Sequence, residues 1–380
     1  MKNILIIYDQ VDNTVEVNLT NLRALFDVDN LSIQCQLSKL VTKHDLDVCD
    51  VCVAIRPSSL YSYNIAKTVK SSGRKLATLF DDDLLNISKS SSLFWRIKYM
   101  KSCLALSDCF ITGNVYIQES YRQYAPHAFF VLSNTFVRES DILPVQPVKD
   151  VIKMVYAAGR DHTPLFDEFI KPEIETVLMK FGDKVEFHIM GIEPDLTGID
   201  DTCRIIRHQP RSYEAYMEFM RNNHFDIGLA PLHDDSFSNK KYFRKYIDYA
   251  QFGVLGLYSR CLPYTLVVKD GYNGLYVDNT PQEWYKAITY AIDNIASLKS
   301  LVQNSQEHLL KEFSYGAVRN HFLEELTPLL NNNSVASDVV YRKSSFGSLL
   351  YELKFRYYQV KASVLAEGLV KTIKKIIYKV

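Results

Sequence analysis

The feature that most constrains this fold is an alternation of short apolar runs with helix-length amphipathic segments, which continues to about residue 330. Strands that alternate with helices form right-handed βαβ units, and such units build a parallel sheet. The apolar runs predict strands at Ile4–Tyr8, Val51–Ile55, Lys75–Phe80, Cys109–Thr112, Phe129–Leu132, Ile152–Ala157, Val185–Met190, Cys203–Arg207, Asp226–Ala230, Val254–Tyr258 and Gly274–Val277. Ligands of such sheets collect beyond the carboxyl ends of the strands, so the residues after each strand are the candidates for function.

The strand–helix pattern is interrupted once. Arg138–Asp150 contains two prolines, mixed charge and no periodicity, which is typical of a linker. A chain of 380 residues, 47% of them hydrophobic, is long enough for two cores. We therefore predict an α/β protein of two Rossmann-like, doubly wound parallel-sheet domains facing across a cleft. The predicted parts are residues 1–140, a linker at 141–150, residues 151–330, whose last helix could return to the first domain, and a helical tail at 331–380.

Charge and cysteine content exclude several classes of protein. The formal net charge is zero, which disfavours a globally basic nucleic-acid binder. No uninterrupted apolar stretch approaches the roughly 18 residues of a spanning helix. The first residues are typical of a buried strand rather than of a signal peptide. Seven dispersed cysteines indicate reduced thiols in a cytosol; Cys49 and Cys52 lie in an apolar run that favours strand packing over a metal or redox role.

The most informative segment follows the predicted strand that ends at Ala230. A helix is expected to open near Asn239 or Lys240, so that Lys241 and Lys245, four residues apart, share one face. Positive charge at a helix N-terminus is unfavourable until an anion binds there, and a diphosphate would meet ammonium and backbone N–H groups together. Asp248, on the neighbouring turn, could accept hydrogen bonds from a ribose diol. A solvated basic helix surface is the alternative.

This segment resembles the donor-binding region of GT-B glycosyltransferases, specifically retaining family 4 and its bacterial polysaccharide-synthesis relatives. The matching residues are Ala230-Pro231-Leu232, Phe237, Lys241, Lys245, Tyr246, Asp248, Tyr249 and the downstream Asp270-Gly271-Tyr272-Asn273-Gly274. The resemblance spans roughly residues 75–330. It implies a nucleotide diphosphate sugar as donor substrate, no other cofactor, and a retaining transfer without a bound metal. Asp248 then corresponds to the ribose-binding second Glu of the E-x7-E motif.

The sequence departs from the family pattern at three positions. Lys240 stands where the family carries the first Glu of that motif, which contacts the donor sugar. Tyr242 replaces the Ser after the first Lys, and Val254 and Leu255 follow Gly253 without the family's Pro. These differences bear on the transferred sugar and on catalytic competence.

Two further strand ends complete the predicted donor site. Gly159, Arg160 and His162 resemble the family's glycine loop, in which a basic residue faces the diphosphate. Arg160 suits a bidentate phosphate contact, and His162 is either a catalytic sugar- or phosphate-binding group or a loop cap. Gly191 resembles a nucleotide-facing glycine, and residues 207–213 would flank the base.

Three adjacent carboxylates, Asp81-Asp82-Asp83, follow a predicted strand of the first half. Like charges held together raise the pKa of at least one carboxyl group when they are partly buried, which suits a general base toward an acceptor hydroxyl. The segment also resembles an acidic element of the polysaccharide-synthesis relatives. We predict Asp82 and Asp83 as catalytic residues, together with His162. A magnesium site and simple helix capping are the alternatives.

The tail carries nine Lys or Arg and three Asp or Glu from Asn331 onward. Between residues 346 and 380 apolar residues recur at three- and four-residue steps, with the basic residues mostly off that stripe and a possible bend at Gly368. This pattern predicts an amphipathic helix on an anionic membrane surface, where each basic residue adds about 1 kcal/mol. Packing on the N-terminal domain or on a second subunit is the alternative.

The sequence therefore predicts a hexosyltransferase-type glycosyltransferase of cell-surface glycan synthesis, cytoplasmic and peripheral on the inner face of the cell membrane. Its partners would be a nucleotide sugar, a glycan or lipid-linked acceptor and the membrane, with no nucleic acid. Two alternatives remain: a non-catalytic GT-B subunit of an active transferase, and a nucleotide-sugar epimerase of the same fold.

Overall fold

The computed structural model describes residues 1–87, 91, 93–199, 203–331, 337, 339–341 and 345–367. The chain divides into two compact units, which are described separately. Unit 1 comprises Met1–Asn134 and Asn320–Val380, and unit 2 comprises Thr135–Arg319. The predicted bend at Gly368 and the predicted helix beyond it lie outside the described residues.

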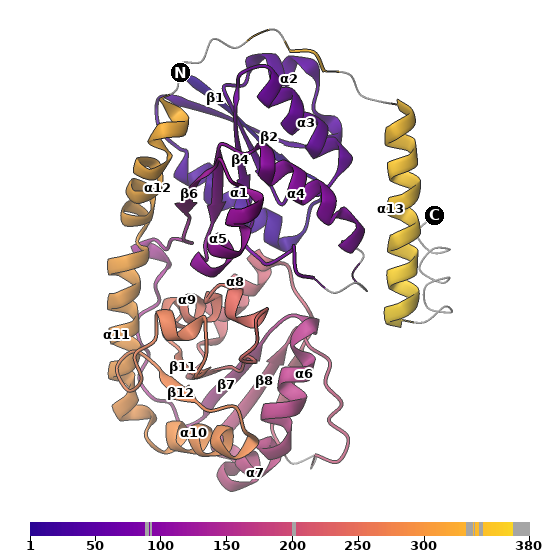
Figure 1. The fold of residues 1–380 in the computed structure, drawn as a ribbon. Helices are drawn as coiled ribbons and strands as arrows, with labels where there is room; N and C mark the ends of the chain where they lie inside the picture. The colour runs from indigo at the N-terminus through magenta and orange to yellow at the C-terminus, as the bar shows by residue number, and fades with distance from the viewer. Residues whose placement is uncertain are drawn as a thin grey trace. The chain divides into compact units, whose positions relative to one another are not determined.

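Unit 1 contains a six-stranded parallel sheet in the order β2-β1-β3-β4-β5-β6 (Figure 1). Its elements are β1 (Lys2–Tyr8), α1 (Asn13–Leu25), β2 (Leu31–Leu37), α2 (Lys43–Val48), β3 (Val51–Ile55), α3 (Leu60–Ser71), β4 (Lys75–Leu79), α4 (Ile97–Leu106), β5 (Cys109–Thr112), α5 (Val115–Tyr121) and β6 (Phe129–Leu132). The central strand β3 is buried along its whole length, as its apolar run predicts. Cys49 and Cys52 are both buried and unpaired, and burial raises the pKa of each thiol.

Unit 2 contains a second six-stranded parallel sheet, in the order β12-β11-β10-β7-β8-β9. Its elements are β7 (Ile152–Ala157), α6 (Thr163–Leu165), α7 (Lys171–Phe181), β8 (Val185–Met190), β9 (Ile205–His208), α8 (Tyr213–Asn223), β10 (Ile227–Ala230), α9 (Arg244–Gln251), β11 (Leu255–Ser259), β12 (Leu275–Val277), α10 (Pro281–Asp293) and α11 (Ile295–Phe313). One continuous core of strand residues and helix residues such as Trp284 and Tyr246 fills the unit. Leu143, in the predicted linker, packs against this core and donates its N–H to Gln251 O at 2.8 Å.

These two sheets confirm the predicted fold class, an α/β protein with two doubly wound, Rossmann-like parallel-sheet domains. In each sheet the chain proceeds outward from one central strand and then returns to continue on its other side. The reversal falls between β1 and β3 in unit 1 and between β7 and β10 in unit 2. At such points the loops from the two strands diverge and leave room for a ligand beyond their carboxyl ends.

The sequence prediction omitted strand β2. Its seven residues, Leu31–Leu37, alternate polar and apolar side chains and are only half-buried, because β2 is the edge strand of its sheet. Such a strand produces no continuous apolar run, and our prediction depended on those runs.

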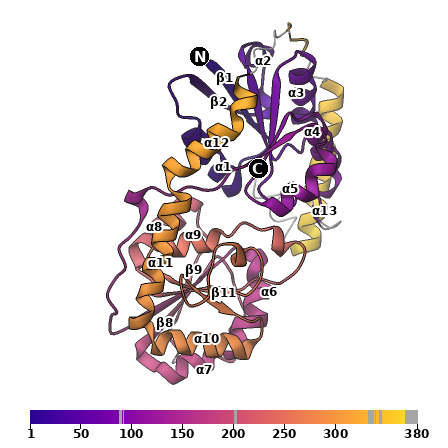
Figure 2. The same ribbon diagram turned by 60° about the vertical axis from the view of Figure 1, so that its left-hand side comes forward.

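Two C-terminal helices belong at least partly to unit 1. Helix α12 (Tyr315–Leu330) packs the ring of Phe322 edge-on against Phe26, with ring centres 5.4 Å apart. Helix α13 (Ser345–Glu367) lies beside α3 and α4 (Figure 2). Its Tyr351 is buried among Tyr61, Trp95 and Tyr99, with ring centres 5.3–5.8 Å apart.

Candidate functional site

The reversal point of unit 2 brings the loop after β7 together with the loop after β10. After β7 the chain forms a 3-10 turn, Arg160–His162. The hydroxyl of Tyr156 donates to the carbonyl of His162 at 2.9 Å, and the N–H of His162 donates to Gly159 O at 2.9 Å. These bonds hold the His162 side chain at the carboxyl edge of the sheet.

Lys241 crosses the reversal point and meets this turn. Its Nζ lies 3.0 Å from His162 Nε2 and 3.5 Å from Asp161 Oδ2, and its side chain is 23% exposed. Our prediction that Lys241 and Lys245 share one helical face was wrong. Helix α9 begins at Arg244, and Lys241 precedes it in extended backbone with φ −69° and ψ 157°. This extended backbone lets Lys241 reach the loop after β7, which a helical Lys241 beside Lys245 would not do.

His162 is held in its neutral form. Burial, and then the nearby ammonium of Lys241, lower the pKa of His162 to about 4, although Asp161 opposes the shift. A neutral imidazole can accept the hydrogen bond from Lys241 at Nε2 and keeps its proton on Nδ1. An arriving anion would reverse this balance, because negative charge beside the ring favours its protonated form.

We predict that His162 titrates near pH 4 in the folded protein, instead of near its ordinary value of 6.5. Because the folded state resists protonation, the free energy of unfolding falls as the pH drops from about 6.5 to about 4, by at most roughly 3 kcal/mol from this group. Histidine NMR titration measures the midpoint directly. Lys241→Met should raise it, since a positive neighbour is removed, and a wild-type midpoint near 6.5 would contradict the prediction.

Behind this contact, a second polar network lies on α8 and α9. Asp248 is buried; its two carboxylate oxygens accept hydrogen bonds from Arg244 Nε at 2.7 Å and from the Tyr216 hydroxyl at 3.1 Å. Lys245 Nζ lies 3.3 Å from the same hydroxyl and 4.9 Å from the ring centre of Tyr216. Burial lowers the pKa of Lys245, and Asp248 opposes that shift. The predicted ribose ligand Asp248 is therefore already bound to Arg244 and Tyr216.

Arg160 and Gly191 lie at the same edge of the sheet. The guanidinium of Arg160 is largely exposed and lies 3.7 Å from Glu193. Gly191 adopts φ +81°, and a Cβ there would lie 2.2 Å from the carbonyl oxygen of Ala158. Only glycine therefore permits the loops after β7 and β8 to approach so closely. The structure brings five of the predicted residues to one edge of the sheet: Gly159, Arg160, His162, Gly191 and Lys241. Lys245 and Asp248 belong to the separate network on α8 and α9.

The three aspartates of unit 1 have separate environments. Asp81 pairs with Arg56 and accepts a hydrogen bond from Asn18 Nδ2 at 2.9 Å. Asp83 is 1% exposed, and both of its carboxylate oxygens lie 2.9 Å from Asn86 Nδ2. Asp82 is half-buried and accepts the N–H of Asp83. This arrangement favours turn capping for Asp83 and leaves Asp82 as the more accessible candidate base.

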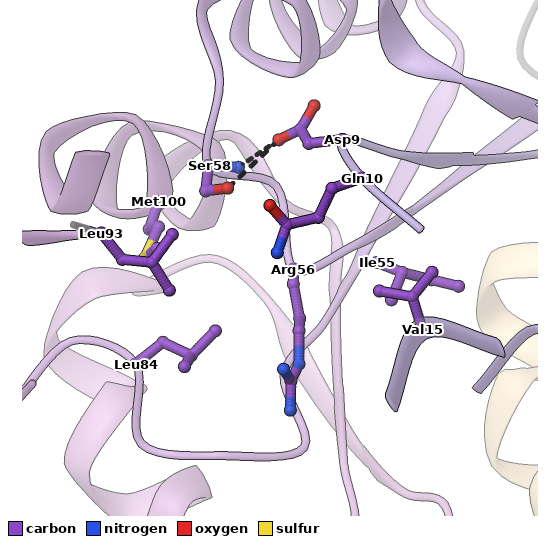
Figure 3. Close-up of a pocket in the computed structure, with 9 residues that line it drawn as sticks. All are labelled: Asp9, Gln10, Val15, Ile55, Arg56, Ser58, Leu84, Leu93 and Met100. Carbon is purple, nitrogen blue, oxygen red and sulfur yellow. Dashed lines mark hydrogen bonds between the residues drawn. The ribbon is translucent and has the colours of Figure 1, made fainter. Parts of the chain in front are cut away.

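A pocket opens at the reversal point of unit 1 (Figure 3). Gln10 and Arg56 lie between an apolar wall of Leu84, Leu93 and Met100 on one side and Ile55 and Val15 on the other. Asp9 also lines the pocket; its side chain is buried and accepts hydrogen bonds from the N–H and hydroxyl of Ser58. Arg56 has φ 45°, an unusual conformation for a residue with a side chain, and such strain is concentrated at functional sites.

Sequence reasoning missed Gln10, Arg56 and Arg244. Arg56 directly follows a predicted strand and Gln10 comes two residues after one, so the strand-end rule, applied to every strand, would have selected both. Arg244 gives no such signal, since its interaction with Asp248 depends on where α9 begins.

In the part of the chain that the structure describes, no three His, Cys, Asp or Glu side chains are placed to hold a metal ion together. None of the helices in that part combines the length and apolar character required to cross a bilayer.

No protein-family model and no curated protein sequence matches the chain. Solved structures do. A glycosyltransferase from Rickettsia africae matches with a TM-score of 0.62 and 11% identity over 87% of this chain and 99% of its own. Anabaena HepE in complex with UDP matches with a TM-score of 0.60 and 13% identity over 87% and 100%. A Listeria monocytogenes protein provisionally assigned as a UDP-N-acetylglucosamine 2-epimerase matches with a TM-score of 0.58 and 10% identity over 90% and 100%.

At such low sequence identity the similarity concerns the fold. The structures that this chain resembles include several GT-B glycosyltransferases, and the two parallel-sheet units account for the match. The chain has the two-domain GT-B fold.

Proposed function

We propose that this protein is a glycosyltransferase that binds a nucleotide diphosphate sugar in unit 2. The contact between Lys241 and His162 across the reversal point of the sheet carries the proposal. It places a cation, a neutral imidazole and the exposed guanidinium of Arg160 where parallel sheets bind ligands. A diphosphate could take over the place of Asp161 beside Lys241 and hydrogen-bond to His162.

The structure suggests a change in how the ribose would be held. Asp248 is occupied by Arg244 and Tyr216, so it acts on a nucleoside through these two neighbours rather than directly. Arg244 donates a hydrogen bond to the hydroxyl of Tyr213, so a guanidinium and a phenol hydroxyl lie side by side next to Asp248. We propose that this pair faces the nucleoside.

The acceptor would enter unit 1 at the pocket lined by Gln10 and Arg56. The pocket has room for little more than one water-sized group, so its polar groups would meet a single hydroxyl of an acceptor that lies at its mouth. Asp82 is the candidate base. The family resemblance supports a retaining transfer without a metal, as part of glycan synthesis in the cytoplasm.

Calorimetric titration of the whole protein with UDP-, GDP- and dTDP-sugars tests this function. The protein should bind at least one of them, and the Anabaena protein with bound UDP makes UDP-glucose the first choice. Failure to bind any of the three would overturn the proposal.

Two other functions have a specific observation in their favour. The occupied Asp248, with Lys240 in place of the family's first Glu, favours a non-catalytic subunit that needs an active partner. The match to the Listeria protein favours an epimerase. An epimerase converts the donor with no acceptor present, and a non-catalytic subunit binds the donor without transfer or hydrolysis.

We also propose that α13 attaches the protein to an anionic membrane surface. While its aromatic residues pack on unit 1, a second set of apolar side chains is 41–61% exposed: Leu349, Leu350, Leu353, Tyr357 and Val360. Exposed basic residues, Arg356 and Lys361, flank this set. The predicted amphipathic stripe therefore includes residues that are left exposed when α13 packs on unit 1.

Replacing Leu353 and Tyr357 by Ser should weaken binding to vesicles of phosphatidylcholine and phosphatidylglycerol by at least about 10-fold, since burial of one large apolar side chain contributes roughly 1.5–3 kcal/mol. Vesicle flotation measures this loss. Met179→Ser, at an equally exposed residue of unit 2, is the control. The membrane proposal would be contradicted if the wild-type protein did not bind anionic vesicles, or if ultracentrifugation showed that it forms dimers through this surface.

A further inference from the structure

A histidine–carboxylate pair lies at the same sheet edge and has no role in the site described so far. His233 follows β10, and its Nε2 donates to Glu168 Oε2 at 2.8 Å. The ring of Phe169 meets the imidazole edge-on, with ring centres 5.4 Å apart. The other ring nitrogen, Nδ1, lies 3.9 Å from Asp235, beyond hydrogen-bonding distance. His233 is 39% exposed, so Nδ1 is able to meet a ligand.

Both members of the pair are fixed by their backbones. Glu168 and Phe169 lie in a π-helical turn, Phe166–Ile170, which ends just before Pro172. Proline has no N–H to donate and its ring crowds the carbonyl four residues earlier, here that of Glu168, so the helix widens at this place. A π-helical turn inside an α-helix is frequent at functional sites.

The residue before His233, Leu232, is held by Ser259 and Asn279. Ser259 Oγ accepts the N–H of Leu232 at 2.8 Å, and Asn279 Nδ2 donates to the carbonyl of Leu232 at 2.7 Å. The hydroxyl of Ser259 also donates to Asn279 at 2.6 Å. His233 thus directly follows a residue whose N–H and carbonyl are both hydrogen-bonded, which limits the conformations open to His233 before a ligand binds.

The order of the groups along the site suggests which part of a ligand His233 meets. His233 lies in the same loop after β10 as Lys241, and Glu168 lies in the same segment after β7 as His162. Both pairs therefore span the reversal point of the sheet. Lys245 contacts Tyr216, whose hydroxyl donates to Asp248 in the network of Arg244, the residue proposed to face the nucleoside. In a nucleotide sugar the diphosphate lies between nucleoside and sugar. The diphosphate is placed at Lys241 and the nucleoside at Arg244. The second pair across the reversal point, His233 and Glu168, is then left for the sugar.

We propose that His233, oriented by Glu168, binds a hydroxyl of the sugar that the donor transfers. Glu168 accepts the hydrogen bond from Nε2, so Nδ1 is the ring nitrogen that meets a sugar hydroxyl. This pair would supply a sugar contact in a chain that has Lys240 in place of the family's first Glu. The inference rests on the proposed function and adds the sugar subsite to it.

The test compares a nucleotide sugar with its own nucleoside diphosphate. Wild-type protein is titrated with UDP-, GDP- and dTDP-glucose, and the tightest of these is then compared with the matching diphosphate. His233→Phe retains a ring against Phe169. It should weaken binding of the nucleotide sugar by about 3- to 10-fold, as expected for one lost hydrogen bond, and leave binding of the diphosphate unchanged. His233→Asn, which retains a polar atom near the position of Nδ1, should recover part of the loss.

Glu168→Gln should show the same selective loss to a smaller extent, because it removes only the group that orients the ring. Glu283→Gln is the matched control, since Glu283 is also an exposed helical carboxylate with one partner, Lys286 at 2.6 Å. Equal weakening of both ligands by His233→Phe, or no change in either, would overturn the sugar subsite while the proposed function stands. Wild-type protein that binds none of the three nucleotide sugars would overturn both.

Discussion

Lys241→Met weakens binding of the preferred nucleotide sugar by about 10- to 100-fold, and this is the largest effect on binding that we expect from a single side chain. A charge-assisted hydrogen bond to phosphate contributes roughly 1.5–3 kcal/mol, and this variant removes the cation while it retains most of the side-chain volume. The loss should be the same for the nucleotide sugar and for its nucleoside diphosphate, because Lys241 meets the diphosphate. Isothermal titration calorimetry measures both.

The control for Lys241→Met is Lys286→Met in the same unit. Lys286 forms an exposed ion pair with Glu283 on α10, and its replacement should leave binding unchanged. Raising the salt concentration should weaken binding of the wild-type protein more than binding of Lys241→Met, since the variant has one cation fewer to screen. A Lys241→Met protein that binds the donor as tightly as wild type would contradict the placement of the diphosphate.

Gly191→Ala should have the second large effect, on stability and on binding together. The left-handed backbone at Gly191 alone costs a residue with a Cβ about 1 kcal/mol, and the contact at 2.2 Å with Ala158 O requires a shift of backbone rather than of a side chain. We expect a loss of about 2 kcal/mol or more in the free energy of unfolding, measured by urea denaturation. Because Ala158 immediately precedes Gly159, the shift should also displace the Arg160–His162 turn and weaken binding of the donor.

Gly271→Ala separates these two costs. Gly271 also has a left-handed backbone, with φ +67°, but a Cβ there would have no atom within 4 Å. This variant should lose only the backbone contribution, about 1 kcal/mol, and should bind the donor normally. Equal losses in the two variants would show that the close approach of the loops after β7 and β8 does not matter.

Each cation at the proposed diphosphate site has a carboxylate neighbour. Lys241 has Asp161 beside it, and Arg160 has Glu193. Each cation therefore has a carboxylate partner that a diphosphate would have to replace. Binding energy from the phosphates is partly spent on this exchange, which keeps the site from having unpaired charge in the absence of donor.

The sequence by itself determined the architecture. Strand β3 and strand β7 were predicted at their observed bounds, and both are buried runs whose apolar character is visible residue by residue. Because a strand inside a parallel sheet buries both faces, it appears in the sequence as a continuous apolar run that can be recognised without knowledge of the fold. The loops that follow such strands could be selected for the same reason, and Gly159, His162 and Lys241 were chosen as candidates in this way.

Only the tertiary structure decided which of these groups meet and in what state. Lys241 left the predicted helix for extended backbone and reached His162, 79 residues away in the chain. Asp248, predicted as an open ligand, is bound to Arg244 and Tyr216, and Glu168 orients His233 from 65 residues away. The physical reason is that hydrogen bonding and burial depend on distances in space, which residue spacing encodes within a helix or strand but not across a sheet.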